Sequence, residues 1–98
     1  MADLREVDPR ELRVSPARMQ GADPAKLSRQ ISLFGRSVVG MPPLLVYEAA
    51  DGVLVLYDGV TRATRIAKLS PKSLVCVEVV GRLPKSCASS PSIGDVLP

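Results

Sequence analysis

The chain contains no histidine and only two cysteines among its 98 residues. Without histidine, a Ser–His–Asp catalytic triad is excluded. Cys76 and Cys87 do not form a Cys-x-x-Cys pair, so no structural zinc or other metal site is predicted. Cys76 lies in an apolar run and is expected to be a buried thiol, whereas Cys87 lies in a polar segment. Whether these two cysteines form a disulfide stays open.

Aromatic residues are scarce, at 3% of the chain, although 46% of the residues are hydrophobic. We therefore expect an aliphatic core, with Phe34, Tyr47 and Tyr57 as its few large members. The sequence has no apolar run of transmembrane length and no charged-then-apolar leader. These features predict a cytoplasmic protein without a membrane partner.

The length of the chain fits one domain. Its composition shifts to Ser, Pro, Lys and Gly near its end. We expect a folded domain over residues 1–81 and a Ser/Pro-rich C-terminal tail over residues 82–98. The tail is either flexible or folds against a surface through Ile93, Val96 and Leu97. It could also dock on a protein partner or on a second copy of the chain.

Local signals place two helices. Asp23 is a good helix N-cap and Gly35 a good helix stop, and between them Leu27, Ile31 and Phe34 form one apolar stripe. A second helix is expected to start directly after Gly59 and to run to about residue 69, with Arg62 and Arg65 on its polar side.

Short apolar runs predict the strands. Residues 43–48 and 53–57 flank an Ala-Asp-Gly turn and are typical of a β-hairpin. Residues 5–7 and 74–80 are expected to be strands as well. Together with the helices, these runs predict an α+β fold with a mixed sheet of about four strands and two main helices.

The junction between the hairpin and the second helix is the most informative stretch. The first amides of a helix lack internal partners and carry partial positive charge, so they suit a phosphate. Glycine lets the backbone approach the anion, and arginine grips two oxygens at once. The predicted ligand-binding residues are Gly59, Val60, Thr61, Arg62 and Arg65.

Carboxylates near this junction are candidates for catalysis. Asp58 directly precedes the glycine and is the best placed. Glu6 and Asp8, at the end of the first strand, could approach the same corner. Phosphotransfer and nuclease chemistry use such groups near a metal ion or an attacking hydroxyl. Solvated surface acids or helix caps are the simpler interpretation of all three.

Basic residues could instead contact nucleic acid. The net charge of +3 permits such a partner without requiring it. No helix-turn-helix and no aromatic stacking platform is visible, so base-specific recognition is not expected. The residues that could form a basic stripe across the two helices are Arg29, Arg36, Arg62, Arg65, Lys68 and Lys72.

The order of these elements and motifs resembles the ParB N-terminal domain family and its sulfiredoxin-like relatives over residues 4–80. The segment from Leu27 to Val46 resembles that family's helix–Gly–Pro–strand segment. Gly59 and Arg62 match the two fixed positions of its Gly-x-x-Arg box. The resemblance implies a bacterial protein with a small ParB/sulfiredoxin-like fold that binds a nucleotide, with or without magnesium.

The two inner positions of the box depart from the family. ParB proteins that hydrolyse CTP carry Gly-Glu-Arg-Arg, and sulfiredoxins carry Gly-Cys-His-Arg, whereas this chain has Val60 and Thr61 at those places. The sulfiredoxin reaction is excluded because its thiolate nucleophile is missing. Three hypotheses follow: a nucleotide- or phosphate-binding domain; a nuclease or phosphotransfer enzyme, such as a toxin or effector domain; and a non-catalytic DNA-binding or protein-interaction module.

Overall fold

Two α-helices and a four-stranded sheet make up the regular structure of the computed structural model, which describes residues 2–15 and 20–98. In chain order the elements are β1 (Leu4–Val7), η1 (Pro9–Glu11), α1 (Pro24–Phe34), β2 (Leu44–Glu48), β3 (Leu54–Asp58), α2 (Val60–Leu69), β4 (Val75–Arg82) and η3 (Gly94–Val96), where η denotes a 3₁₀ turn. The predicted α+β class, with a mixed four-stranded sheet and two main helices, is confirmed.

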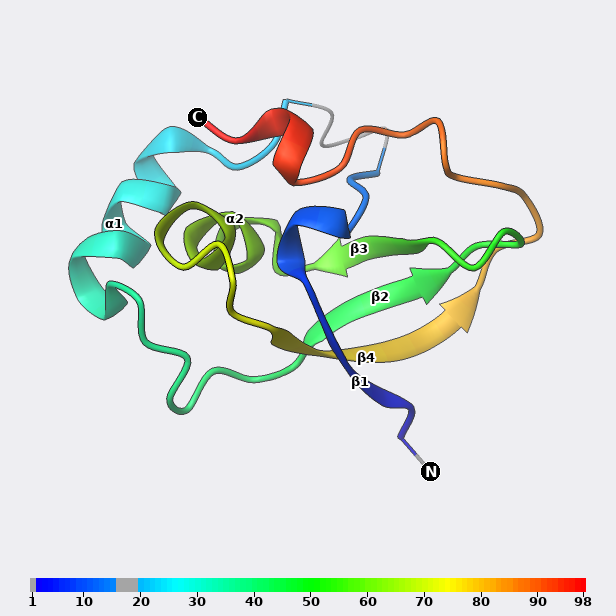
Figure 1. Cartoon of the computed structure of the whole chain (residues 1–98), viewed down its shortest axis with the longest axis horizontal. Coiled ribbons are helices and arrows are strands. Elements are labelled where there is room, and N and C mark those ends of the chain that lie inside the picture. Colours follow the sequence, from blue (N-terminus) through cyan, green and yellow to red (C-terminus); the bar gives the residue numbers. More distant parts are fainter. Residues whose placement is uncertain (1, 16–19) are drawn as a thin grey trace.

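The strand order in the sheet is β1-β4-β2-β3 (Figure 1). The hairpin partners β2 and β3 are antiparallel, as are β1 and β4, while β2 runs parallel to β4. Leu45 is paired with Glu78 on one side and with Asp58 on the other. Because directly paired residues share a face of the sheet, these three side chains lie in one row across it.

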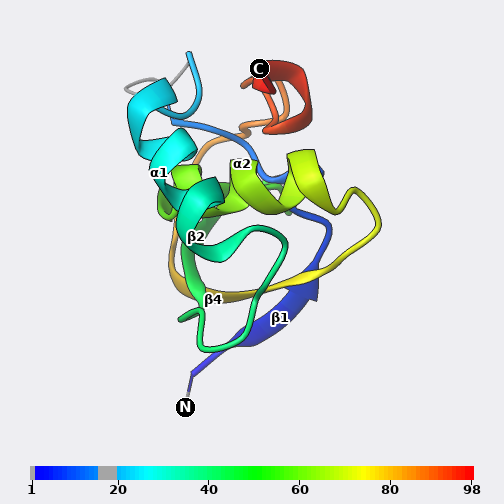
Figure 2. The same ribbon diagram turned by 90° about the vertical axis from the view of Figure 1, so that its left-hand side faces the viewer.

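The core lies between the sheet and α2. Val75 and Val77 from β4 pack with Leu44 and Val46 from β2, and α2 contributes Ile66 to the same cluster. Figure 2 shows α2 lying along one face of the sheet, with α1 beside it and the connection from α1 to β2 forming a wide loop. Since α2 is covered by α1 and η1 as well as by the sheet, most of its circumference is buried.

The C-terminal segment belongs to the folded body. The amide of Ile93 donates to the carbonyl of Leu12 at 2.8 Å, and the amide of Val14 donates to that of Pro91 at 2.9 Å. Arg13 in turn exchanges backbone hydrogen bonds with β3, so both segments extend the sheet beyond that strand. Ile93 is fully buried. Of the two alternatives for residues 82–98, the packed one is therefore observed.

The expected roles of the two cysteines were wrong. Cys87 is the buried thiol, at 6% exposure against Ala49 and Val55, whereas Cys76 is half-buried. Both thiols are free. The polar composition around Cys87 hides its burial because the turn that carries it folds onto the hairpin.

The aromatic residues do not form the centre of the core. Tyr57 is 63% exposed and Phe34 is 49% exposed, and Tyr47 is half-buried at the edge of the Tyr57 ring. The predicted aliphatic core is observed, but the prediction of three large core members was wrong. Of the apolar stripe on α1, only Leu27 is fully buried. Within the described residues, no helix is both long and apolar enough to cross a bilayer.

Candidate functional site

Gly59 forms the turn at which β3 becomes α2. Its φ of 112° lies in the left-handed region, and a side chain there would place a Cβ 2.6 Å from Cδ2 of Leu44. Only glycine fits both constraints. Gly59 is the N-cap of α2, and no side chain caps the helix in the described structure. The amides of Val60, Thr61 and Arg62 are consequently left without a side-chain acceptor.

A polar hollow of about 200 Å³ lies in front of these amides. It brings together the start of α2, the end of β3 and one flank of α1. The residues that line the polar hollow are Lys26, Gln30, Tyr57, Asp58, Gly59, Val60, Thr61 and Arg62. Lys26 and Gln30 lie one turn apart on α1 and add a cation and an amide that the sequence analysis did not assign to the site.

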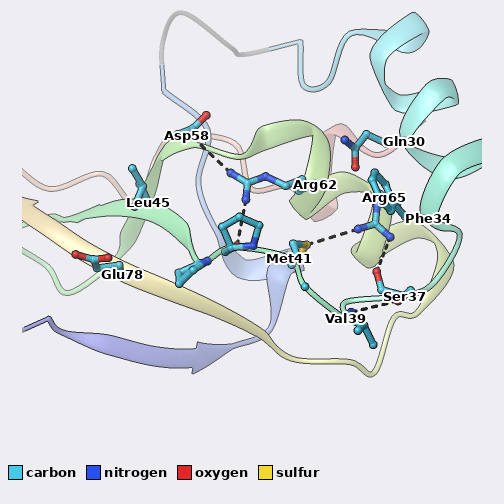
Figure 3. A pocket seen from close by; sticks show the side chains of 13 residues that line it. Gln30, Phe34, Ser37, Val39, Met41, Leu45, Asp58, Arg62, Arg65 and Glu78 are labelled. Carbon is cyan, nitrogen blue, oxygen red and sulfur yellow. Dashed lines mark hydrogen bonds and ion pairs between the residues drawn. The ribbon is translucent and has the colours of Figure 1, made fainter.

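Arg62 occupies the boundary between the polar hollow and a second, larger pocket. Its Nη1 donates to the carbonyl oxygen of Pro42 at 3.1 Å, and its Nη2 lies 3.5 Å from Oδ2 of Asp58 (Figure 3). The Arg62 side chain is 20% exposed and that of Asp58 is 66% exposed. This ion pair is solvated and therefore weak, so the guanidinium can exchange partners for an anion.

The larger pocket has a volume of about 590 Å³ and is open to solvent. Its walls come from the end of α1, the loop that follows, and the Glu78–Leu45–Asp58 row of the sheet (Figure 3). We call it the apolar pocket, because six of its lining residues are Phe34, Val39, Met41, Pro42, Pro43 and Leu45. The polar side chains on it are Gln30, Ser37, Asp58, Arg62, Arg65 and Glu78.

The sequence predicted Arg65 on an exposed polar face of α2, but the structure places it in the interior. It is only 2% exposed, and its Nη1 donates to the carbonyls of Gly35 at 2.7 Å and Ser37 at 2.8 Å. Its guanidinium also lies 5.4 Å from the ring centre of Phe34 and contacts Sδ of Met41. Arg65 thus fastens the loop after α1 to α2. Arg65 nevertheless lines the apolar pocket, so its contact with a ligand stays a prediction.

The charge of Arg65 is not neutralised by any carboxylate of the described residues. Its Nε is buried without a hydrogen-bond partner. Burial, together with the positive charge of Arg62, lowers the pKa of Arg65 from its ordinary value. A buried cation of this kind leaves positive potential at the pocket wall, and that potential favours an anionic ligand.

Of the three candidate carboxylates, the structure brings only Asp58 to this corner. Glu6 is exposed on β1, paired with Cys76. Asp8 accepts the amide of Arg10 and lines a separate hollow beside η1. Glu78 was not among the predicted site residues; its signal is a lone carboxylate within the apolar run of β4. A nucleotide-bound magnesium ion takes one or two carboxylates, and Asp58 is the one that the polar hollow offers.

The basic stripe is also revised by the structure. Arg29 and Arg36 are exposed, as are Lys68 and Lys72, but the burial of Arg65 interrupts the stripe. Three or more metal-ligating side chains are not gathered anywhere in residues 2–15 and 20–98.

No protein-family model matches the chain, and no curated protein matches it either.

Proposed function

We propose that this chain binds a phosphate-bearing ligand, with a nucleotide as the preferred class, at the start of α2. The resemblance to the ParB and sulfiredoxin-like proteins supports this proposal, because the matching Gly59 and Arg62 are the residues that the site uses. The phosphate lies in the polar hollow on the amides of Val60, Thr61 and Arg62.

One observation carries the proposal: the first residues of α2, whose amides have no side-chain cap, and two cationic side chains line the same polar hollow. Gly59 adds no side chain to the polar hollow, and Arg62 and Lys26 both line it. Helix N-termini bind anions through their amides and the helix dipole. Arg62 adds a bidentate, charge-assisted contact.

The apolar pocket supports the nucleotide class. It shares Gln30, Asp58 and Arg62 with the polar hollow, so one ligand can occupy both. Apolar walls with a few polar groups are typical of sites that take a flat organic moiety. Asp58 and Glu78 offer carboxylate acceptors for the hydroxyl and amino groups of a nucleoside.

Calorimetric titration with CTP, ATP, ADP and inorganic phosphate, with and without magnesium, tests the proposal. Arg62→Ala is expected to weaken nucleotide binding at least about tenfold while circular dichroism stays unchanged. Arg10→Ala is the matched control, since Arg10 is exposed and lines the separate hollow beside η1. If none of these ligands binds the wild-type chain, the proposal is wrong.

A second candidate function is phosphotransfer or nuclease catalysis, which the placement of Asp58 favours. Its carboxylate lies 3.5 Å from the Arg62 guanidinium at the rim of both pockets. Such a carboxylate can accept a proton from an attacking hydroxyl or hold a metal ion. Asp58→Asn should then abolish turnover and retain nucleotide binding. If the wild-type chain releases no product from nucleotides or nucleic acid, only the binding function remains.

A further inference from the structure

Exposed apolar side chains gather where α1 ends. Four large ones lie within seven consecutive residues: Leu33 (67% exposed), Phe34 (49%), Val38 (44%) and Val39 (90%). Side chains of this size are rarely grouped in this way on a soluble surface without a binding role. Val39 and Phe34 also line the apolar pocket, so the group continues into a concavity (Figure 3).

The charges on α1 and on the loop that follows it have one sign. No acidic residue occurs between Asp23 and Glu48, whereas Lys26, Arg29 and Arg36 lie in that interval. All three basic side chains are exposed. Lys26, Arg29 and Leu33 are spaced three, four or seven residues apart on α1, so they lie along one flank of the helix. We call the exposed residues Lys26, Arg29, Leu33, Phe34, Arg36, Val38 and Val39 the α1–loop surface.

We propose that the α1–loop surface docks a protein segment in which apolar side chains are flanked by aspartate or glutamate. An apolar side chain of the partner enters the apolar pocket between Phe34, Val39 and Met41, where it competes with the nucleoside of the proposed ligand. The acidic residues of the partner meet the basic flank of α1. Charge complementarity of this kind sets the partner and the orientation, while the buried apolar anchor supplies most of the affinity.

The shape and the apolar lining of the pocket favour a protein segment over a lipid bilayer or DNA. A bilayer surface is flat and cannot fill a pocket of about 590 Å³. Duplex DNA presents charged phosphates and polar base edges, which do not match the apolar lining between Phe34, Val39 and Met41.

Selection from a random-peptide display library on the immobilised chain tests this inference. We expect the enriched peptides to combine an aliphatic or aromatic residue with neighbouring Asp or Glu. Fluorescence anisotropy of a labelled enriched peptide should show at least about tenfold weaker binding to the double variant Leu33→Ser, Val39→Ser. Leu74→Ser is the matched control, because Leu74 is 54% exposed outside the α1–loop surface. Both Leu33 and Val39 are more exposed than Leu74, so folding is not at risk.

Charge reversal separates the acidic partner from any merely apolar one. Arg29→Glu should weaken binding of the same peptide severalfold, and added salt should weaken binding to the wild-type chain.

The inference is overturned if the enriched peptides are basic, or if they bind the double variant as tightly as the wild type. It is also overturned if vesicles containing phosphatidylserine, or duplex DNA, bind through Leu33 and Val39 while no peptide does. Arg62→Ala, which removes the proposed phosphate contact, should leave peptide affinity within about twofold, so the two proposals can fail separately.

Discussion

At the scale of single residues, Gly59 has a constraint that few other positions share. A residue with a Cβ at a φ of 112° is strained, and the same Cβ would overlap Leu44 from β2 and approach Nη2 of Arg62 at 3.2 Å. Gly52 also has a positive φ, of 83°, but open space surrounds it. Comparing substitutions at Gly59 and Gly52 therefore separates the cost of backbone strain from the cost of steric overlap.

Gly59→Ala is expected to lower the free energy of unfolding by about 2–4 kcal/mol, because strain and overlap act together. Gly52→Ala should cost about 1 kcal/mol from backbone strain alone. Urea denaturation of the two variants and the wild type measures both values. Equal losses in the two variants would show that the Leu44 contact relaxes without cost.

Arg65 stabilises the loop between α1 and β2 by donating hydrogen bonds to its carbonyl groups. Replacing it with methionine keeps a long side chain beside Phe34 and Met41 but removes Nη1, which donates to the carbonyls of both Gly35 and Ser37. Removing an unpaired buried charge offsets part of this loss, so global stability is a poor readout. Hydrogen exchange of the Met41 amide, which donates to Val38, should instead become about tenfold faster. Unchanged exchange at Met41 would mean that the loop holds its shape without Arg65.

At the scale of elements, residues that act on their immediate neighbours in the chain were enough to predict the ends of α1 and the hairpin. The side chain of Asp23 caps α1 through the amide of Lys26, and Gly35 ends the helix, both as expected. The hairpin was predicted because its two apolar runs flank a turn. Phe34 could not be placed from its helical spacing alone, because the long loop after α1 leaves that end of the stripe uncovered.

The candidate site was only half predictable for the same reason. Gly59 through Arg62 are adjacent in the chain, so sequence alone places them at one turn. Lys26 and Glu78 reach the two pockets only through the packing of α1 and the register of β4. Arg65 was expected to be exposed because it lies one turn after Arg62 on the same side of α2. In the structure, α1 covers the turn of α2 that carries Arg65.

Asp51, in the turn between β2 and β3, binds the C-terminal segment through its carboxylate. Asp51 accepts hydrogen bonds from the Ser86 hydroxyl and from the amides of Cys87 and Ala88, and so fixes the start of the C-terminal segment. These bonds, led by the one from Ser86, lower the pKa of Asp51 below its ordinary value. The unfolded chain therefore binds a proton at Asp51 more readily than the folded chain does.

The resulting stability is fully present above the unfolded-state pKa of Asp51 and is lost as the pH falls through the folded-state pKa. Asp51→Asn should lower the melting temperature at pH 7, and the gap to the wild type should close as the pH falls below about 4. Melting curves recorded by circular dichroism across this range measure the gap. A gap that is independent of pH would mean that the mutation acts by disturbing the hydrogen-bond arrangement around residue 51 and not by removing the charge of Asp51.

At the scale of the whole molecule, the C-terminal segment closes the core. Ile93 is fully buried among residues from both ends of the chain, including Leu12 and Val14. Its surroundings could not be predicted, because a Ser/Pro-rich composition around a single apolar residue is equally typical of a flexible tail. The hydrogen bonds that place Ile93 join segments about eighty residues apart.

Ile93→Ala should lower the free energy of unfolding by about 2–5 kcal/mol, because it leaves a cavity in a filled core. Val80→Ala is the control and should cost less than about 1 kcal/mol, since Val80 is 43% exposed. Urea denaturation measures both. A chain shortened after residue 90 that kept wild-type stability would contradict the role assigned to this segment.

The pairing of residues 91–93 with residues 12–14 has a consequence for biosynthesis. While the ribosome still holds Ile93, the emerged part of the chain has no cover for Leu12 and Val14. Such an intermediate exposes apolar surface and is a substrate for chaperones. Translational pausing before Ile93 emerges should therefore prolong chaperone occupancy.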